Sequence, residues 1–246
     1  MLGFIVVGDP KKKNEIYSEN ALMMLSFIAD RAELTVSNIL VREQAERDEL
    51  TGIYNKAYLN NRTRVEVANC LEQGSPLSYI MIDADDFKWF NDNQGYFAGN
   101  EVLKALVNAI KNVVRPTDEF CRWSGEELIV LAPGTNKLGG LAAAEKILNT
   151  VRTDSKIKQL EKEYHRKISV SIGVAYFDCQ EELSEFINEE VNSVSQALFQ
   201  RSEYALKQAK KSGKDQLCES KPFKLGENDK DILPIKVMIV SNDKEY

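Results

Sequence analysis

Two adjacent carboxylates, Glu126 and Glu127, follow a pair of small residues at a point where two apolar runs meet. Ser124-Gly125 lies between these runs within residues 120–130. Because such a pair accommodates the positive φ angles of a tight hairpin, the pattern predicts a hairpin with two acids at its turn. Adjacent strand residues point to opposite faces, so at least one glutamate can face a ligand. An isolated S-G-E-E sequence is more often a surface hairpin with solvated glutamates, so its interpretation depends on partners elsewhere in the chain.

A second acidic cluster lies upstream, in residues 81–92. This segment begins with the apolar pattern of a buried strand and then carries Asp83, Asp85 and Asp86. Carboxylate and backbone oxygens are the ligands that hard divalent cations prefer. The two clusters together have the composition of a site for such a cation.

The composition is that of a soluble globular protein with room for one large domain and flanking pieces. Of its 246 residues, 43% are hydrophobic and 28% are charged. The net charge of −6 argues against a general nucleic-acid or anionic-membrane binder, since such surfaces are basic over a whole face. Any phosphate binding must therefore be local.

The few cysteine and histidine residues exclude several kinds of site. The four cysteines are far apart and form no C-x-x-C pair: Cys70, Cys121, Cys179 and Cys218. We expect buried free thiols in a reducing compartment. The single histidine, His165, is predicted to be exposed, which argues against zinc enzymes and histidine-dependent triads. No apolar run approaches the roughly 18 residues of a membrane span, and residues 1–7 do not form a signal peptide, so we expect a cytoplasmic protein.

Hydrophobic periodicity predicts an α/β domain preceded by a long helix. Helices are expected from about Ser18 and over residues 55–73, 99–114, 138–154 and 190–212, with strands over 77–83 and 168–176 in addition to the hairpin. A mixed sheet flanked by helices follows from this order. The first helix carries a heptad-like seam of Leu22, Leu25, Ala29, Ala32, Val36 and Ile39. That seam fits either packing on its own domain or a parallel dimer.

Five ordered blocks resemble the GGDEF family of diguanylate cyclases over about residues 46–218. They are residues 48–56, 83–103, 124–128, 170–175 and 205–214. The resemblance implies a fold similar to nucleotidyl cyclase and polymerase palm domains. It also implies an enzyme that condenses two GTP molecules into cyclic di-GMP and releases pyrophosphate by two-metal catalysis.

The resemblance also assigns roles to the acids. Asp83, Glu126 and the main-chain carbonyl of Ala84 would bind Mg²⁺ or Mn²⁺. Glu127 would either add to metal binding or help to deprotonate the attacking hydroxyl, and these alternatives stay open. Asp85 and Asp86 are interpreted as solvated acids at the end of the strand.

Substrate binding is implied for seven residues: Lys88, Asn91, Asn100, Ser124, Gly125, Lys210 and Lys214. Lys214 replaces an arginine that is usual in the family, so it keeps the charge but loses the bidentate fork. Asn100 replaces the acid that accepts hydrogen bonds from guanine, and an amide edge matches adenine at least as well. ATP is therefore a second candidate substrate.

Arg115 and Asp118 match the R-x-x-D inhibitory site of the family, which implies binding of the product cyclic di-GMP. Two other functions remain open. One is a degenerate module that binds nucleotide or cyclic dinucleotide without catalysis, because Ser124, Leu128, Asn100 and Tyr96 depart from the family pattern. The other is a cyclase that makes cyclic GMP-AMP.

The expected organisation has five parts. Residues 1–17 resemble the C-terminal end of a GAF sensor domain, 18–47 form a signalling helix that supports a homodimer, and 48–218 form the catalytic domain. Residues 219–234 read as a linker, and 235–246 resemble the start of a receiver-like domain.

Overall fold

The computed structural model describes residues 19–177 and 189–220. The chain divides between Arg47 and Asp48 into two compact units, and each unit is described by itself. The GAF-like segment 1–17, most of the predicted linker 219–234 and the receiver-like segment 235–246 lie outside the described residues, as does Cys179.

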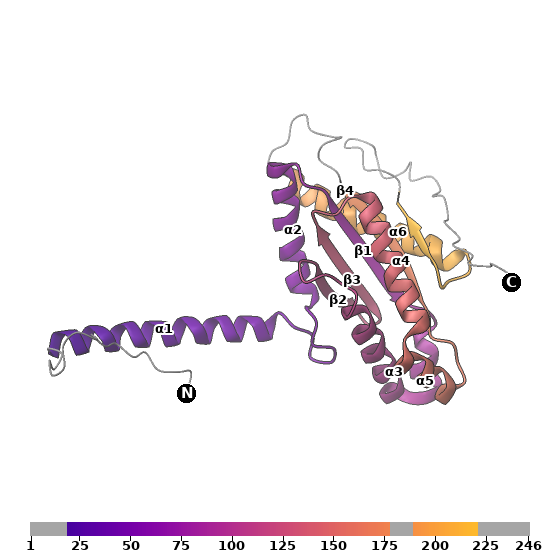
Figure 1. Ribbon diagram of the computed structural model, residues 1–246, viewed down its shortest axis with the longest axis horizontal. Helices are drawn as coiled ribbons and strands as arrows, with labels where there is room; N and C mark the ends of the chain where they lie inside the picture. The colour runs from indigo at the N-terminus through magenta and orange to yellow at the C-terminus, as the bar shows by residue number, and fades with distance from the viewer. Residues whose placement is uncertain (1–18, 178–188, 221–246) are drawn as a thin grey trace. The chain divides into compact units, whose positions relative to one another are not determined.

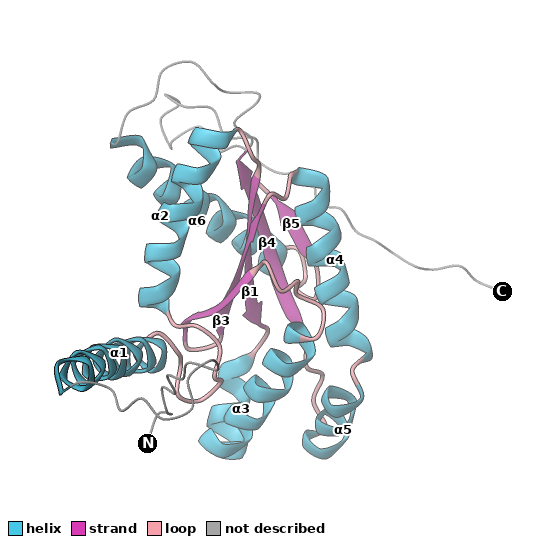
Figure 2. Cartoon of the chain, turned by 60° about the vertical axis from the view of Figure 1, so that its left-hand side comes forward, coloured by secondary structure: helices cyan, strands magenta, loops and turns pink. Residues whose placement is uncertain are grey.

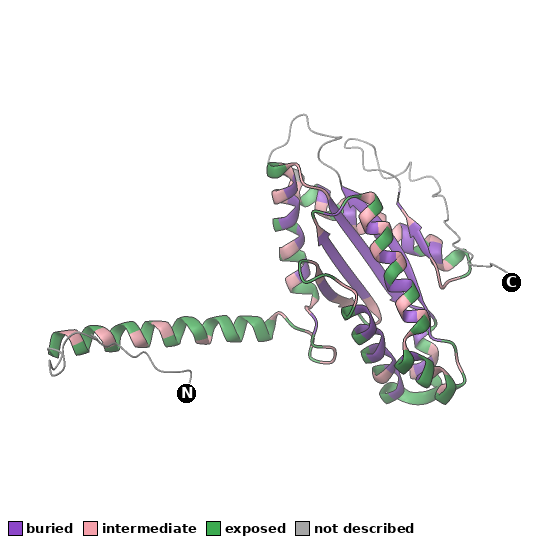
Figure 3. Ribbon diagram, viewed as in Figure 1, coloured by how far each residue is buried: buried purple, intermediate pink, exposed green. Residues whose placement is uncertain are grey.

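The first unit contains one long helix, α1 (Glu19–Ala45), which has no buried residue. It begins at Glu19, close to the start predicted at about Ser18. Figure 3 shows exposed and partly exposed residues along its whole length. Its exposed apolar side chains are Leu22, Met23, Met24, Phe27, Ile28, Leu34, Val36, Ile39, Leu40 and Val41.

The second unit contains a five-stranded mixed sheet in the order β2-β3-β1-β4-β5. The strands are β1 (Leu77–Ala84), β2 (Glu119–Ser124), β3 (Glu127–Pro133), β4 (Val170–Phe177) and β5 (Leu217–Glu219). The central strand β1 pairs antiparallel with β3 and β4, whereas β5 runs parallel to β4. All residues of β1 and β4 are buried, so both faces of the sheet centre are covered.

Helices cover both faces of this sheet (Figures 1 and 2). One face packs against α3 (Phe87–Lys111), α4 (Lys137–Thr153) and α5 (Ser155–Tyr164), and the other against α2 (Lys56–Gln73) and α6 (Glu189–Lys211). The predicted α/β class with a mixed, helix-flanked sheet is confirmed.

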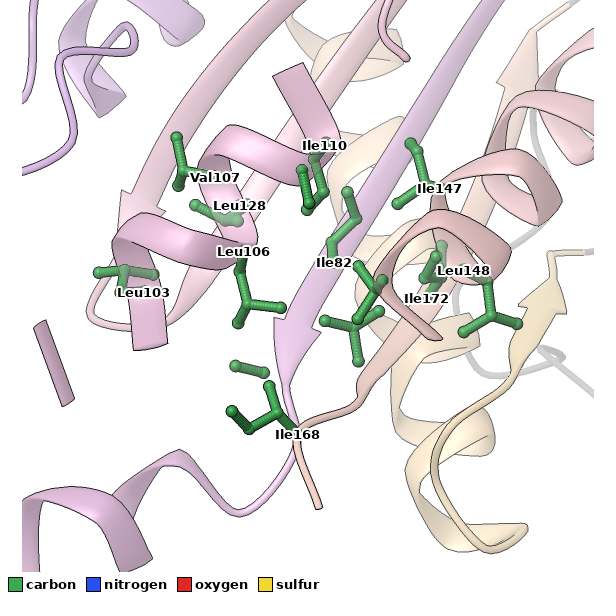
Figure 4. Packing of buried hydrophobic residues seen from close by; sticks show 14 of the residues in the cluster. Ile82, Leu103, Leu106, Val107, Ile110, Leu128, Ile147, Leu148, Ile168 and Ile172 are labelled. Atoms are coloured by element: carbon green, nitrogen blue, oxygen red, sulfur yellow. The ribbon is translucent and has the colours of Figure 1, made fainter. Parts of the chain in front are cut away.

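Alternation along β1 builds the two cores. Ile80 and Ile82 point into the core shared with α3 and α4, whereas Tyr79 and Met81 point toward α2 and α6. Figure 4 shows Ile82 packed among Leu106, Ile110, Leu128, Ile147 and Ile172. Burying each side chain of this kind stabilises the fold by about 1.5–3 kcal/mol. Apolar packing is therefore a major contribution to holding the helices on the sheet.

One prediction of local structure was wrong, and two elements were not predicted. Helix α3 begins at Phe87, not near residue 99, and its two halves meet at Gly95, where φ is 84° and ψ is 165°. Helix α5 and strand β5 were not predicted. A helical pattern is hard to recognise before Gly95 because glycine carries a low helix propensity and the two halves are not in phase.

Two expectations from composition are confirmed for the described part of the chain. Cys70, Cys121 and Cys218 are buried and form no disulfide bond there, and His165 is exposed. None of the described helices combines the length and the apolar character that crossing a membrane requires.

Candidate functional site

The hairpin between β2 and β3 brings its acids to the end of β1. Gly125 lies at the turn with φ of 26°, as the small Ser-Gly pair predicts. Glu127 is directly opposite Asp83 in the β1–β3 register, and the backbone N–H of Ala84 donates to the carbonyl of Glu126 at 3.4 Å. Directly opposed residues lie on the same face of a sheet, so the Asp83 and Glu127 side chains are neighbours. The two acidic clusters of the sequence therefore meet.

Asp83 is the most perturbed acid of this site. It is 4% exposed, and Lys210 of α6 places its Nζ 2.7 Å from the Asp83 Oδ2. Burial raises the pKa of Asp83 to about 6; the charges of Glu126 and Glu127 also raise it, and Lys210 opposes them. A buried carboxylate among other acids favours either a proton or a cation.

The carboxylate oxygens of Asp83, Glu126 and Glu127 are of the kind that binds a hard divalent cation. Two of these side chains, Asp83 and Glu127, are bonded to other protein groups. The mutual charge effects show that Asp83, Glu126 and Glu127 share one electrostatic environment. No group of three His, Cys, Asp or Glu side chains reaches metal-binding spacing within the described residues. Asp83 is instead paired with Lys210, and Glu127 accepts a hydrogen bond from the Ser124 hydroxyl. Binding a cation would require these side chains to exchange partners.

The interpretation of Asp85 as a solvated acid was wrong. Its side chain is buried and accepts hydrogen bonds from Ser169 Oγ at 2.7 Å, Ser171 Oγ at 2.6 Å and the Asp215 N–H at 3.0 Å. These three donors offset the cost of burying the carboxylate. Asp85 therefore fixes the end of β1 against β4 and the segment after α6.

Asp86 is exposed, as expected, but it is paired with two cations. Lys214 Nζ lies 2.6 Å from one carboxylate oxygen, and Arg166 Nη2 lies 3.2 Å from the other. These pairs lower the pKa of Asp86, with the Lys214 hydrogen bond as the largest cause. Asp86 has φ of 55°, so the chain turns sharply between β1 and α3 at this residue.

The three candidate phosphate-binding lysines come from different elements. Lys210 lies in the last turn of α6, Lys214 in the following loop, and Lys88 is exposed in the first turn of α3. Lys210 and Lys214 pair with Asp83 and Asp86, one residue on either side of the Ala84-Asp85 segment. The end of β1 is therefore flanked by cations that can neutralise a phosphate.

Asn91 and Asn100 lie on the two halves of α3, on either side of the kink at Gly95. Asn91 is half-buried and Asn100 is exposed. A Cβ on Gly99 would come within 2.0 Å of Asn91 Oδ1, so the glycine leaves room for this amide beside the second half of the helix.

Comparison with known proteins identifies the second unit. A sequence profile described as "Diguanylate cyclase, GGDEF domain" matches residues 45–216. The chain belongs to the GGDEF family. It is 33% identical to Diguanylate cyclase DgcP of Pseudomonas aeruginosa over 181 residues, which cover 72% of this chain and 24% of that protein. It is 28% identical to Diguanylate cyclase A of Treponema denticola, covering 90% of this chain and 57% of that one.

The fold is likewise shared with a solved structure, that of the coiled coil and GGDEF domain of DgcB from Caulobacter crescentus in complex with c-di-GMP. The TM-score is 0.65 at 21% identity, and the match covers 82% of this chain and all of that one. The chain spans about a quarter to just over half of the two curated relatives named above.

The R-x-x-D segment of this GGDEF domain forms a turn before β2. The backbone N–H of Arg115 donates to Asp118 Oδ2 at 3.1 Å, and the Asp118 N–H donates to the Arg115 carbonyl at 3.0 Å. The Arg115 side chain is exposed, and Asp118 Oδ1 is buried without a hydrogen-bond partner in the described structure. Burial raises the pKa of Asp118. Asp118 therefore keeps one unused acceptor oxygen in the described structure, close in sequence to an exposed arginine.

One contact of the GGDEF domain was missed in the sequence. Arg122 Nη1 lies 3.0 Å from both oxygens of Asp48, and Arg122 Nε donates to the Gly125 carbonyl at 2.9 Å. Both residues lie within or beside the family blocks, but no periodicity relates residues so far apart. The one signal available in the sequence was an arginine, Arg122, in an apolar strand two residues before Ser124, where a charged side chain needs a partner.

Proposed function

We propose that this chain carries a diguanylate cyclase domain, which condenses two GTP molecules into cyclic di-GMP and releases two pyrophosphates. The observation that carries the proposal is the opposition of Asp83 and Glu127 across β1 and β3, with Lys210 bound to Asp83. The relatives named diguanylate cyclases support the reaction class.

The atoms balance as two equivalent transfers. In each, the 3′-oxygen of one GTP forms a bond to the α-phosphorus of the other, the bond to the bridging oxygen breaks, and pyrophosphate leaves with its electron pair. Asp83, Glu126 and the Ala84 carbonyl would hold Mg²⁺ or Mn²⁺, which when bound supplies charge stabilisation at the α-phosphate and a more acidic 3′-hydroxyl.

The protein's own side chains complete the site. Lys210 and Lys214 offset phosphate charge once they leave Asp83 and Asp86, and Lys88 adds a further cation at the start of α3. Glu127, which accepts a hydrogen bond from Ser124, would either add to metal binding or accept the proton of the 3′-hydroxyl. The Gly125 turn leaves space for the triphosphate to approach the backbone.

Two sites must face each other to join two nucleotides, and α1 supports a homodimer that provides this. Its apolar side chains are exposed at spacings of three and four residues. The buried free cysteines support a reducing, cytoplasmic location. We also propose cyclic di-GMP as the ligand of Arg115 and Asp118, since the orphaned Asp118 oxygen can accept from guanine N1–H.

Product analysis by mass after incubation with GTP and Mg²⁺ tests the enzyme against the rival of a catalytically inactive module. We expect cyclic di-GMP from the parent and at least a hundredfold less from Asp83→Asn and Glu126→Gln. Glu163→Gln, which removes an exposed acid of α5, is the matched control and should retain the parental rate. A parent that binds GTP but forms no product would favour the binding module.

A second candidate activity, formation of cyclic GMP-AMP, is favoured by Asn100. Its amide presents one donor and one acceptor, which pair with adenine N1 and N6. Incubation with equal GTP and ATP distinguishes the two cyclases by product mass.

A further inference from the structure

A cavity of about 350 Å³ lies on the α2 and α6 side of the sheet, and no residue proposed for the cyclase site lines it. Its wall is formed by residues of four elements, including Thr63 and Arg64 of α2, Tyr79 of β1, Trp123 of β2 and Phe199 of α6. Figure 2 shows α2 and α6 on the same side of the sheet. The volume is in the range of pockets for small organic ligands.

The apolar part of this cavity is aromatic. The rings of Trp123 and Phe199 have centroids 4.6 Å apart and are inclined by 43°, and both side chains are partly exposed. Lys56 Nζ lies 3.9 Å from the centroid of the Trp123 ring. Partly exposed aromatic rings at a cavity wall offer stacking area to a planar ligand.

The polar part of the cavity contains an unsatisfied group. Thr63 is 5% exposed, lines the cavity, and its hydroxyl has no hydrogen-bond partner in the described part of the chain. A buried hydroxyl without a partner is unfavourable, and a hydrogen bond to a ligand's polar atom would remove that cost.

The charge at this cavity is positive. Arg64 is the one charged residue among the described residues that line it, and Lys56 adds a second cation at the Trp123 ring. No carboxylate belongs to the described lining, so nothing there repels an anion.

We propose that this cavity binds a small aromatic anion, with its ring against Trp123 and Phe199 and its negative charge at Arg64. The proposal uses no residue of the proposed nucleotide site and does not depend on cyclase activity.

The probe is 2-naphthoate, a planar aromatic carboxylate, added to the full chain. The chain has two tryptophans, Trp89 and Trp123, so Trp89→Phe leaves Trp123 as the sole reporter. We expect a saturable change of Trp123 fluorescence, confirmed by calorimetry on the parent. In the reporter background, Arg64→Gln should weaken binding at least tenfold, whereas Arg31→Gln, at an exposed arginine of α1, should not.

Two further comparisons test the ring and the hydroxyl. Phe199→Leu should weaken 2-naphthoate binding several-fold while leaving circular dichroism unchanged. Thr63→Val removes the buried hydroxyl and keeps the shape of the side chain, so it should weaken 2-naphthoate binding if the hydroxyl contacts the ligand. The neutral amide 2-naphthamide should bind at least tenfold more weakly than the acid. Absence of saturable binding at millimolar probe, or equal affinities for Arg64→Gln and the parent, overturns the proposal. Equal affinities for acid and amide would overturn the anion preference.

Discussion

Arg122 holds Asp48 through both carboxylate oxygens, at 3.0 Å each, and holds the carbonyl of Gly125 through its Nε. Burial tends to raise the pKa of Asp48, but hydrogen bonds from Thr51 and Arg122 outweigh it, and the pKa is lowered. The first residue of the second unit is thereby linked to the turn that precedes Glu126. This guanidinium therefore adds a link between the turn and Asp48 to the β2–β3 pairing.

We expect Arg122→Ala to lower both the free energy of unfolding and the rate of cyclic di-GMP formation. A partly buried bidentate pair is worth about 1–3 kcal/mol, more than an exposed ion pair. Asp48→Asn should lower stability similarly but reduce the rate less, because the bond to Gly125 remains. Urea unfolding and initial rates measure both effects.

The matched control is Lys158→Gln, which removes the exposed pair with Glu161. It should change the free energy of unfolding by less than about 0.5 kcal/mol. A double-mutant cycle with no coupling between Asp48 and Arg122 would contradict the structural link.

Asp83 should make the folded protein less stable as the pH rises from about 4 to 6. Its folded pKa of about 6 exceeds the ordinary value near 4, so across this interval the folded state retains a proton that the unfolded state has released. Asp83→Asn cannot titrate, and its stability relative to the parent should therefore increase by up to about 3 kcal/mol between pH 4 and pH 7. Urea unfolding at several pH values measures this difference.

The exposed Asp92→Asn controls for loss of a carboxylate in the same unit. Parallel pH profiles for the parent and Asp83→Asn would show that Asp83 does not carry the raised pKa.

Charged residues on the seam of α1 should dissociate the proposed dimer. Leu25→Lys with Val36→Lys places two cations on an apolar face, so we expect monomer by light scattering and lower cyclase activity at low protein concentration. Ser26→Lys with Asn38→Lys adds the same charge at exposed polar positions and should leave the dimer intact. An unchanged mass for the Leu25 and Val36 variant would remove this seam from the interface.

Arg115→Ala should weaken cyclic di-GMP binding at least tenfold and relieve product inhibition. Loss of a bidentate cation accounts for this size, and the initial rate should change little because Arg115 has no contact with the acids of the turn. Calorimetric titration measures the affinity. The control is Lys111→Ala, which removes a nearby exposed cation at the end of α3. Equal affinities of Arg115→Ala and the parent for cyclic di-GMP would show that Arg115 has only a structural role.

Asn100→Asp should sharpen preference for guanine by about tenfold or more at equal GTP and ATP, because the acid accepts from both guanine donors. The parent is expected to form some adenine-containing product. Asn108→Asp, at an exposed position of the same helix, controls for the added charge. A parent that is already strictly guanine-specific, with no gain in the variant, would show that Asn100 does not read the base.

The sequence patterns predict that a buried strand and a hairpin each carry acids, but neither pattern predicts that Asp83 and Glu127 meet. The resemblance to the GGDEF family implied one shared site, and the antiparallel register of β1 and β3 places the two residues opposite each other. The state of Asp85 could not be deduced in this way. Its burial depends on Ser169, Ser171 and the Asp215 N–H, which β4 and the segment after α6 bring from more than 80 residues away.

Two elements escaped sequence analysis for related reasons. Strand β5 has three residues and exists because it pairs in parallel with β4, a long-range contact without a local pattern. Helix α5 has ten residues, and its buried residues Ile157 and Leu160 span a single turn, so its apolar stripe is short and was overlooked.

The bend of α3 at Gly95 makes the relative placement of Asn91 and Asn100 depend on the backbone angles of one residue. An added Cβ at Gly95 would meet nothing within 4 Å, yet its φ of 84° would strain any larger residue. An alanine there would therefore remove no contact while favouring a straighter helix. Nucleotide selectivity would then change because the angle between the two halves of α3 changes, although Asn91 and Asn100 would both still be present.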